Sequence, residues 1–361
     1  MHNIFKHILK LADKALVIIL LGCLVSCSKW NTEIESDIPL SFVATANGIV
    51  EADLKSSATK SPNALVENAT HLKQYPISIL AKATKGSTTY PIFSNEKLYY
   101  SNENIWDYDN TQYWIPEADY YFSAFAPYAC PSGYNVENSL SNGTVALTET
   151  NSSPVLTITG YNTGKDSGFD ARTEDLLFDQ TERLNSYTSN VVDYSQVLLD
   201  FSHKLACVSF YIRNTTNTDI ISLTNISLQG IQYQCDINVS TTSCSIFPDE
   251  NRTNSTNNFF QSTDRTGSSP NPFLPKGMSE EQYKPLFDCE FLTVLPQALW
   301  GNYIPLTFTD GAKEKKMNLG NIESVRRWEE GKKYRYNISI TSTDIIFQVV
   351  EVPWIEHEVE L

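Results

Sequence analysis

The sequence predicts an all-β protein, and three observations carry that prediction. Short runs rich in Val, Ile, Thr, Tyr and Phe recur along the chain, and several alternate apolar and polar residues with a period of two. Asn, Ser, Thr, Gly and Pro separate these runs, as in the turns between antiparallel strands. Helix signals are few, with two short candidates at residues 278–284 and 323–330. Many short strands with polar turns are typical of β-sandwiches or barrels.

Eleven runs are predicted to form strands. The first, residues 38–44, alternates Leu40, Phe42 and Ala44 with Ser and Val, so that one apolar row can face a core. The last, residues 345–351, is long, apolar and flat, which is typical of a strand that aggregates unless it is paired. The strands between them are predicted at residues 75–80, 118–126, 155–159, 197–201, 205–212, 220–228, 291–295, 303–308 and 334–341.

Residues 1–26 have the order of a bacterial secretory signal: a basic segment, an apolar run and a small residue before a cysteine. The Leu-Val-Ser-Cys run that ends at Cys27 resembles the lipobox of bacterial lipoproteins, whose cysteine carries lipid after cleavage. The apolar run is about 11 residues long, well short of the roughly 20 that span a bilayer, which favours a lipoprotein over a transmembrane anchor. Cys23 also fits a lipobox loosely, but Cys27 leaves the longer apolar run and is the predicted lipidation site.

The rest of the chain is predicted to hold a tether and two β domains. Residues 27–37 are polar, acidic and without periodicity, as expected for a tether. About 330 residues remain after the signal, more than one β core commonly holds. A polar break before the middle predicts domains at residues 38–192 and 193–361. Residues 251–275, rich in Asn, Ser, Thr, Gly and Pro, predict a long surface loop in the second domain.

Charge and motifs argue against several functions. The formal net charge is −15, and an acidic surface argues against binding nucleic acid or spreading over anionic lipid. The histidines after the signal, His71, His203 and His357, are widely separated, and no metal-binding, nucleophile or phosphate-loop motif is present. The sequence therefore predicts no enzyme activity, no metal and no cofactor. His203 is predicted to be a structural residue at a turn.

Cysteines and aromatic residues leave two questions open. Cys235 and Cys244 could close a hairpin loop in an oxidising compartment, and two free thiols are equally compatible with the sequence. Eight Tyr and Trp residues lie between residues 99 and 121. Such rings suit a sugar-binding platform, with Trp106 and Trp114 as its test residues, although filling a sandwich core is the favoured interpretation.

Short motifs in a fixed order resemble those of the fimbrillin-like lipoproteins of Bacteroidales, a family related to major and minor fimbrial subunits. In the first half the matching pieces are the lipobox, the first strand and residues 59–60, 113–116, 121–127 and 175–178. In the second half they are residues 199–206, 294–297, 328–336 and 352–354.

The resemblance implies two tandem transthyretin-like β-sandwich domains with few short helices, and adhesion rather than catalysis. In polymerising relatives an arginine- or lysine-specific protease removes the first strand, and a strand of another subunit fills the emptied groove. Here the nearest basic residues after the first strand are Lys55 and Lys60, and no arginine precedes Arg172, which puts arginine-specific processing in doubt.

The same resemblance names the segments that would exchange. Leu40 and Phe42 belong to the strand that would be removed. Ile346 and Val350 belong to the C-terminal run that would be donated.

The expected function is that of an outer-membrane lipoprotein, exposed on the cell surface or in a fimbrium, that acts as a shaft, anchor or tip subunit. Its expected partners are other fimbrial subunits, the membrane through its lipid, and a host or bacterial surface ligand. The alternative function is a surface glycan-binding lipoprotein. The choice among shaft, anchor and tip, the adhesion ligand and the removal of the first strand stay open at this point.

Overall fold

The computed structural model describes residues 38–46, 66, 69–101, 105–163, 174–181, 184–185, 196–248, 260–311, 313–342 and 345–352. Within these ranges the fold is almost entirely sheet, which confirms the predicted fold class. The helical elements there are a four-residue helix, α2 (Ala69–Leu72), and a 3-10 turn, η2 (Leu319–Asn321). No helix in this part of the chain is long and apolar enough to cross a bilayer. The predicted signal peptide, Cys27 and the tether lie outside the described residues.

Each of the eleven predicted runs overlaps a strand. They correspond to β1 (Phe42–Ala46), β2 (Ile77–Lys85), β5 (Asp119–Ala126), β7 (Ser153–Asn162), β10 (Val197–His203), β11 (Ala206–Asn214), β12 (Ser222–Leu228), β18 (Leu292–Val294), β20 (Pro305–Asp310), β23 (Lys333–Ile340) and β24 (Ile345–Val352). Strands without a prediction are β3 (Thr88–Tyr100), β4 (Trp106–Asp107), β6 (Thr144–Thr150), β8 (Leu177–Gln180), β9 (Leu184–Asn185), β13 (Gln234–Ser240), β14 (Ser243–Pro248), β15 (Phe260–Gln261), β16 (Arg265–Thr266), β17 (Lys284–Pro285), β19 (Gln297–Ala298), β21 (Lys313–Asn318) and β22 (Arg327–Trp328).

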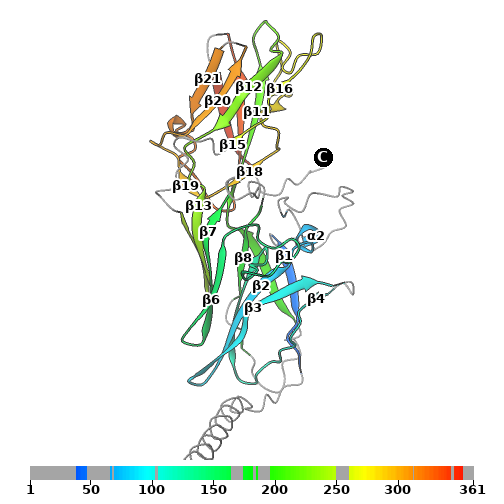
Figure 1. The fold of residues 1–361 in the computed structure, drawn as a ribbon, viewed down its shortest axis with the longest axis vertical. Coiled ribbons are helices and arrows are strands. Elements are labelled where there is room, and N and C mark those ends of the chain that lie inside the picture. Colours follow the sequence, from blue (N-terminus) through cyan, green and yellow to red (C-terminus); the bar gives the residue numbers. More distant parts are fainter. Residues whose placement is uncertain are drawn as a thin grey trace, which may run out of the picture.

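The first part of the fold is a ring of strands around one apolar core. Its order is β2-β3-β4-β1-β10-β8-β5-β9, and a further pairing of β2 with β5 closes the order on itself. Side chains that alternate along these strands, among them Phe42, Ile79, Phe122 and Leu199, fill the interior. In Figure 1 these strands lie towards one end of an elongated molecule. The strand β1 is therefore one of the strands that form this ring, between β4 and β10.

A second sheet, β14-β13-β7-β6, packs on the outer face of β2, β5 and β8. Leu80 and Phe125 of the ring meet Leu156 and Ile237 of this sheet in a shared core. The sheet joins β7, which precedes residue 193, to β13, which follows it. The strand β10 also lies after residue 193 and pairs with β1. Strand pairing thus crosses the predicted domain boundary, and the division into residues 38–192 and 193–361 stays a prediction.

At the other end of the molecule two five-stranded sheets share one core (Figure 1). One has the order β17-β11-β23-β24, with β18 also paired to β11, and the other has the order β15-β12-β20-β21, with β16 also paired to β12. Large side chains from both sheets, including Phe210, Tyr336 and Phe308, form the core between them, and Trp328 of β22 (Arg327–Trp328) joins this core. A short pair, β19 and β22, lies beside it.

Two kinds of sequence prediction were wrong. The described part of the expected loop, residues 260–275, contributes β15 and β16 to a sheet and buries Phe260 and Leu274 in the core. Neither helix candidate forms a helix, because residues 278–284 make one turn before β17 and residues 323–330 contain β22.

Candidate strand-exchange site

Residues 40–44, which lead into and through the first half of β1, carry the apolar row that their sequence predicted. Leu40, Phe42 and Ala44 are 2%, 4% and 5% exposed, and the residues between them are only half-buried. The alternation follows from the pleat of an extended chain, in which successive side chains point to opposite faces. One face of this segment therefore belongs to the core of the ring.

Phe42 is the centre of an aromatic cluster. Its ring centroid lies 5.8 Å from that of Phe93, 5.8 Å from that of Tyr108 and 5.9 Å from that of Phe122, each in an edge-to-face arrangement. Edge-to-face pairs add to the stabilisation that comes from burying the rings. Phe93 lies in β3, Tyr108 directly follows β4, and Phe122 lies in β5. Phe42 therefore fills a pocket that is formed by elements other than β1.

Both edges of β1 are hydrogen-bonded. It runs parallel to β10, with a register from Phe42 opposite Val197 to Ala46 opposite Phe201. On its other side Phe42 pairs with Trp106 of β4 in an antiparallel bridge. Loss of β1 would open a groove with unpaired backbone groups on both walls and exposed apolar side chains on its floor.

Residues 108–114 hold the chain that leads into β1. The hydroxyl of Tyr108 donates to the backbone carbonyl of Leu40 at 2.8 Å, and the amide of Leu40 donates to the carbonyl of Gln112 at 2.8 Å. The amide of Trp114 donates to the carbonyl of Ile38 at 3.1 Å. Trp106 and Trp114 are buried, so these two residues fill the core rather than form an exposed platform for sugars.

The predicted processing sites, Lys55 and Lys60, lie outside the described residues. The chain is held again at Val66, whose buried amide donates to Oδ2 of Asp175 at 2.9 Å. The same carboxylate oxygen lies 2.9 Å from Nδ1 of His203, the last residue of β10. All three residues are buried. His203 therefore has a structural role, and the Asp175–His203 pair fixes the chain downstream of both lysines.

The strand β24 is an edge strand. It pairs with β23 without a break, from Ile345 opposite Ile340 to Val352 opposite Lys333. Among the described residues β23 is its one partner strand. Ile345 and Val349 pack against the core, whereas Ile346 is 59% exposed and Val350 is half-buried. The two residues singled out in the sequence, Ile346 and Val350, thus belong to the outward row of this strand.

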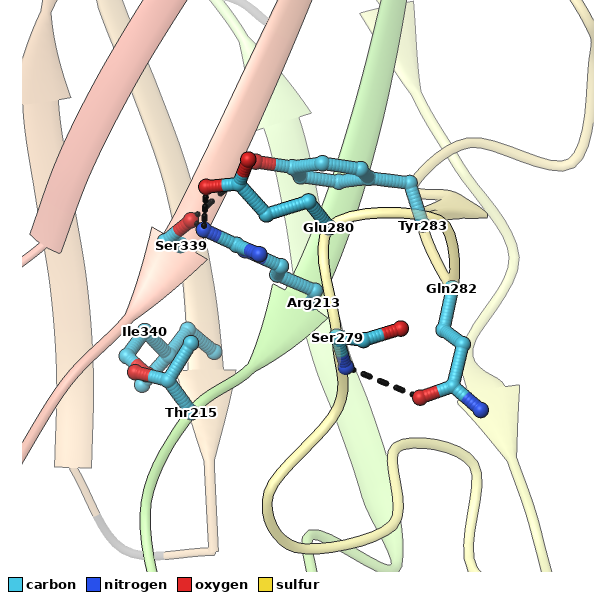
Figure 2. Close-up of polar contacts among 8 residues, drawn as sticks. All are labelled: Arg213, Thr215, Ser279, Glu280, Gln282, Tyr283, Ser339 and Ile340. Carbon is cyan, nitrogen blue, oxygen red and sulfur yellow. Dashed lines mark hydrogen bonds and ion pairs between the residues drawn. The ribbon is translucent and has the colours of Figure 1, made fainter.

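The other edge of β23 is held firmly. It runs parallel to β11 in a register of eight residues, and both the amide and the hydroxyl of Thr215 donate to the carbonyl of Ile340 at 2.9 Å. Arg213 on β11 donates through Nε to Oγ of Ser339 at 2.7 Å. Figure 2 shows Arg213 beside Ser339, and Thr215 beside Ile340, at the end of β23 from which the chain continues to β24. The strand β23 therefore has partners that do not depend on β24.

A loop between the two sheets closes over Arg213. Glu280 accepts from Nη2 of Arg213 at 3.2 Å, and the guanidinium lies 5.0 Å from the ring centroid of Tyr283. The amide of Ser279 donates to the side-chain oxygen of Gln282 at 2.8 Å, which caps the single turn in this loop (Figure 2). Arg213 thereby joins β11, β23 and the loop in one cluster.

The described residues hold no group of three or more His, Cys, Asp or Glu side chains with the arrangement of a metal site. Cys235 and Cys244 form no disulfide, and burial raises the pKa of both thiols, to about 12 for Cys244. Sequence reasoning missed Tyr108 and Arg213 as residues that hold the exchange segments. The aromatic-rich stretch contained Tyr108, but no spacing pattern linked it to Leu40.

Comparisons with known proteins give a family match and several similar solved structures. A family model described as fimbrillin-like matches residues 64–354. No curated protein matches the chain. A fimbrial protein from Bacteroides vulgatus has a similar structure, with a TM-score of 0.52 and 15% identity over 88% of this chain and 99% of that chain. A proposed cell adhesion protein from Bacteroides ovatus has a TM-score of 0.48 and 15% identity over 89% of this chain and 99% of that chain. One from Bacteroides uniformis has a TM-score of 0.46 and 17% identity over 88% of this chain and 99% of that chain.

Proposed function

Because the chain belongs to the fimbrillin-like family, we propose that it is a fimbrial subunit that assembles by β-strand exchange. Its precursor is a lipoprotein held to the outer membrane through Cys27. Cleavage at Lys55 or Lys60 frees the segment that contains β1, and a strand from another subunit takes its place. No catalytic step is part of this proposal.

The position of β1 in the ring is the observation that carries the proposal. After a cut in the segment between β1 and Val66, only non-covalent contacts hold β1 between β4 and β10. The Asp175–His203 pair would keep the new N-terminal end attached at Val66. Strand addition uses backbone hydrogen bonds for affinity and alternate side chains for specificity, and a vacated groove offers both.

We propose β24 as the donor, and its sequence suggests a register. The buried row that leads into β1 reads Leu40-x-Phe42-x-Ala44, and the sequence of β24 at alternate positions reads Ile345-x-Phe347-x-Val349. Both rows have an aliphatic residue, a phenylalanine and a smaller aliphatic residue at alternate positions. In this register Phe347 takes the place of Phe42. Ile346 and Val350 take the places of Ser41 and Thr45 on the side of β1 that is half-buried.

The number of partner strands of β24 gives an energetic reason for its transfer into the groove of another subunit. In its own subunit it has β23 as partner, whereas in the groove it would have strands on both sides. Each backbone hydrogen bond contributes about 1 kcal/mol net, so a second partner strand favours the exchanged state. The contacts of Arg213 and Thr215 would keep β23 in its sheet after β24 leaves.

Truncation tests this function. Deletion of residues 344–361 should abolish polymers at the cell surface, while the secreted chain stays a folded monomer with its own β1 in place. Fibres formed by the truncated chain, or equal polymerisation of chain that is not cleaved before Val66, would contradict the mechanism.

Two double variants form a matched pair, in which the first tests the proposed register and the second is its control. Ile345→Asn with Val349→Asn changes the inward row and should block assembly, because polar side chains would enter an apolar groove. Ile346→Asn with Val350→Asn makes the same chemical change on the outward row and should leave assembly largely intact. Equal loss in both variants would contradict the proposed register.

A further inference from the structure

A polar groove of about 460 Å³ opens on the sheet β15-β12-β20-β21. Its lining consists of amide, hydroxyl and carboxylate side chains from all four strands, with no aliphatic or aromatic side chain. The apolar residues of the same strands, such as Leu228 and Phe308, face the core on the other side. The groove thus lies on the outer face of a sheet that does not contain β1.

One row of polar side chains crosses the groove in strand register. Gln261 of β15 is opposite Ser227 of β12, and Ser227 is opposite Thr307 of β20. The hydroxyls of Ser227 and Thr307 lie 2.7 Å apart. Thr307 is in turn opposite Lys316 of β21. Residues in register on neighbouring strands share one face of a sheet, so these groups form a continuous polar row.

A β-bulge places an amide beside this row. The pairing of β12 with β20 shifts register between Thr224 and Ser227, and Asn225 there has a φ of 51°. Its Nδ2 lies 3.4 Å from Oγ1 of Thr309, which is opposite Glu314 of β21. Bulges redirect side chains and are enriched beside functional sites. This bulge directs an amide into the groove, opposite a carboxylate.

An exposed aromatic ring lies beside the groove. Tyr303 is 59% exposed, and Nζ of Lys316 is 5.0 Å from its ring centroid. Since Lys316 belongs to the polar row, the ring stands next to that row. A tyrosine of this kind offers an apolar face together with a hydroxyl.

We propose that this groove binds a neutral sugar of a surface glycan. Vicinal hydroxyls of a sugar both donate and accept, and planar amides, hydroxyls and a carboxylate match them as partners. The apolar face of a sugar ring can rest on the part of the exposed Tyr303 ring that Lys316 does not cover. The charged side chain in the lining itself is the carboxylate of Glu314, which disfavours an anionic ligand, while the ammonium of Lys316 lies at the edge against Tyr303. The described residues offer no metal-site group. The site lies on a sheet face, so it does not suit addition of a peptide strand, which needs a free edge.

This inference is independent of the assembly mechanism, because the groove and the β1 site use different strands. The test uses the full chain purified in detergent and not polymerised, with lactose, N-acetyllactosamine, mannobiose, cellobiose and 3′-sialyllactose as probes. Binding is measured by saturation-transfer NMR and titration. The groove variant is Gln261→Ala with Glu314→Ala, which removes an exposed amide and an exposed carboxylate from opposite sides. The matched control is Asn238→Ala with Glu149→Ala, an exposed amide and carboxylate on the sheet β14-β13-β7-β6.

We expect saturable binding of at least one neutral probe, with affinity at least about tenfold lower in the groove variant and unchanged in the control. Absence of any neutral probe binding up to about 10 mM, equal binding by the groove variant and the unchanged chain, or binding of sialyllactose alone would each overturn the proposal.

Discussion

The hydroxyl of Tyr108 donates a hydrogen bond to the backbone carbonyl of Leu40 across 2.8 Å of buried space. Burial raises the pKa of this hydroxyl above its ordinary value, so it stays protonated even in mildly alkaline solution. The same tyrosine packs its ring edge-to-face against Phe42. One side chain thus holds both the backbone and the apolar row of the segment that we propose is exchanged.

Tyr108→Phe keeps the ring and removes only the hydroxyl. We expect the free energy of unfolding to fall by about 1 kcal/mol, because the buried carbonyl of Leu40 loses a partner. Urea denaturation of the unprocessed chain measures this change. Tyr99→Phe is the control, since its hydroxyl makes an exposed contact of 3.5 Å with Asp109, and its stability should not change measurably.

Phe42→Ala removes the ring at the centre of the aromatic cluster. The expected loss of unfolding free energy is about 3–5 kcal/mol, from lost burial and from the cavity left among Phe93, Tyr108 and Phe122. Val43→Ala, on the half-buried face of the same strand, should cost no more than about 1 kcal/mol. Similar losses in the two variants would show that the two faces of β1 do not differ as described.

Glu174 should make stability depend on pH. It is buried, and desolvation raises its pKa from 4.5 to about 7 although it accepts hydrogen bonds from Tyr161 and Ser141. Between these pH values the folded chain keeps a proton that the unfolded chain has released. The free energy of unfolding should therefore fall as pH rises from about 4.5 to about 7, by about 3 kcal/mol from this group.

The difference between the unchanged chain and Glu174→Gln isolates that contribution. Denaturation curves at several pH values should show a shallower fall for Glu174→Gln within this window. Glu149→Gln, an exposed control, should follow the unchanged chain. If the free energy of unfolding falls equally with pH in the unchanged chain and in Glu174→Gln, the pKa of Glu174 is not raised.

Arg213→Ala should matter more when β24 is absent. With β24 in place β23 is paired on both edges, whereas after truncation at residue 344 it depends on β11 and on the contact of Arg213 with Ser339. A double-mutant cycle of Arg213→Ala and the truncation should therefore give a coupling of about 1 kcal/mol in unfolding free energy. Additive effects would mean that Arg213 does not support β23 when β24 leaves.

Strand existence was predictable because it depends on local alternation, and the row of Leu40, Phe42 and Ala44 is an example. Pairing was not predictable, because β1 meets β10 across more than 150 residues and no local pattern encodes that register. The expected loop at residues 251–275 failed because single apolar residues, Phe260 and Leu274, are buried within a polar composition. The expected helix after Met278 failed because the chain makes only one turn, in which the amide of Gln282 donates to the carbonyl of Ser279, and then enters β17 with Pro285.

The most direct test of strand exchange is a disulfide between two subunits. In β1, Val43 is opposite the exposed Leu198 of β10, and in the proposed register Gln348 of the donor takes the place of Val43. Cysteines at register positions on adjacent strands lie within the Cα range that a disulfide requires. Polymers that carry Leu198→Cys and Gln348→Cys should therefore form a ladder of covalent oligomers under mild oxidation. Each single variant, and the pair Leu198→Cys with Glu351→Cys, should not. Polymers in which Leu198→Cys and Gln348→Cys do not cross-link would contradict the account.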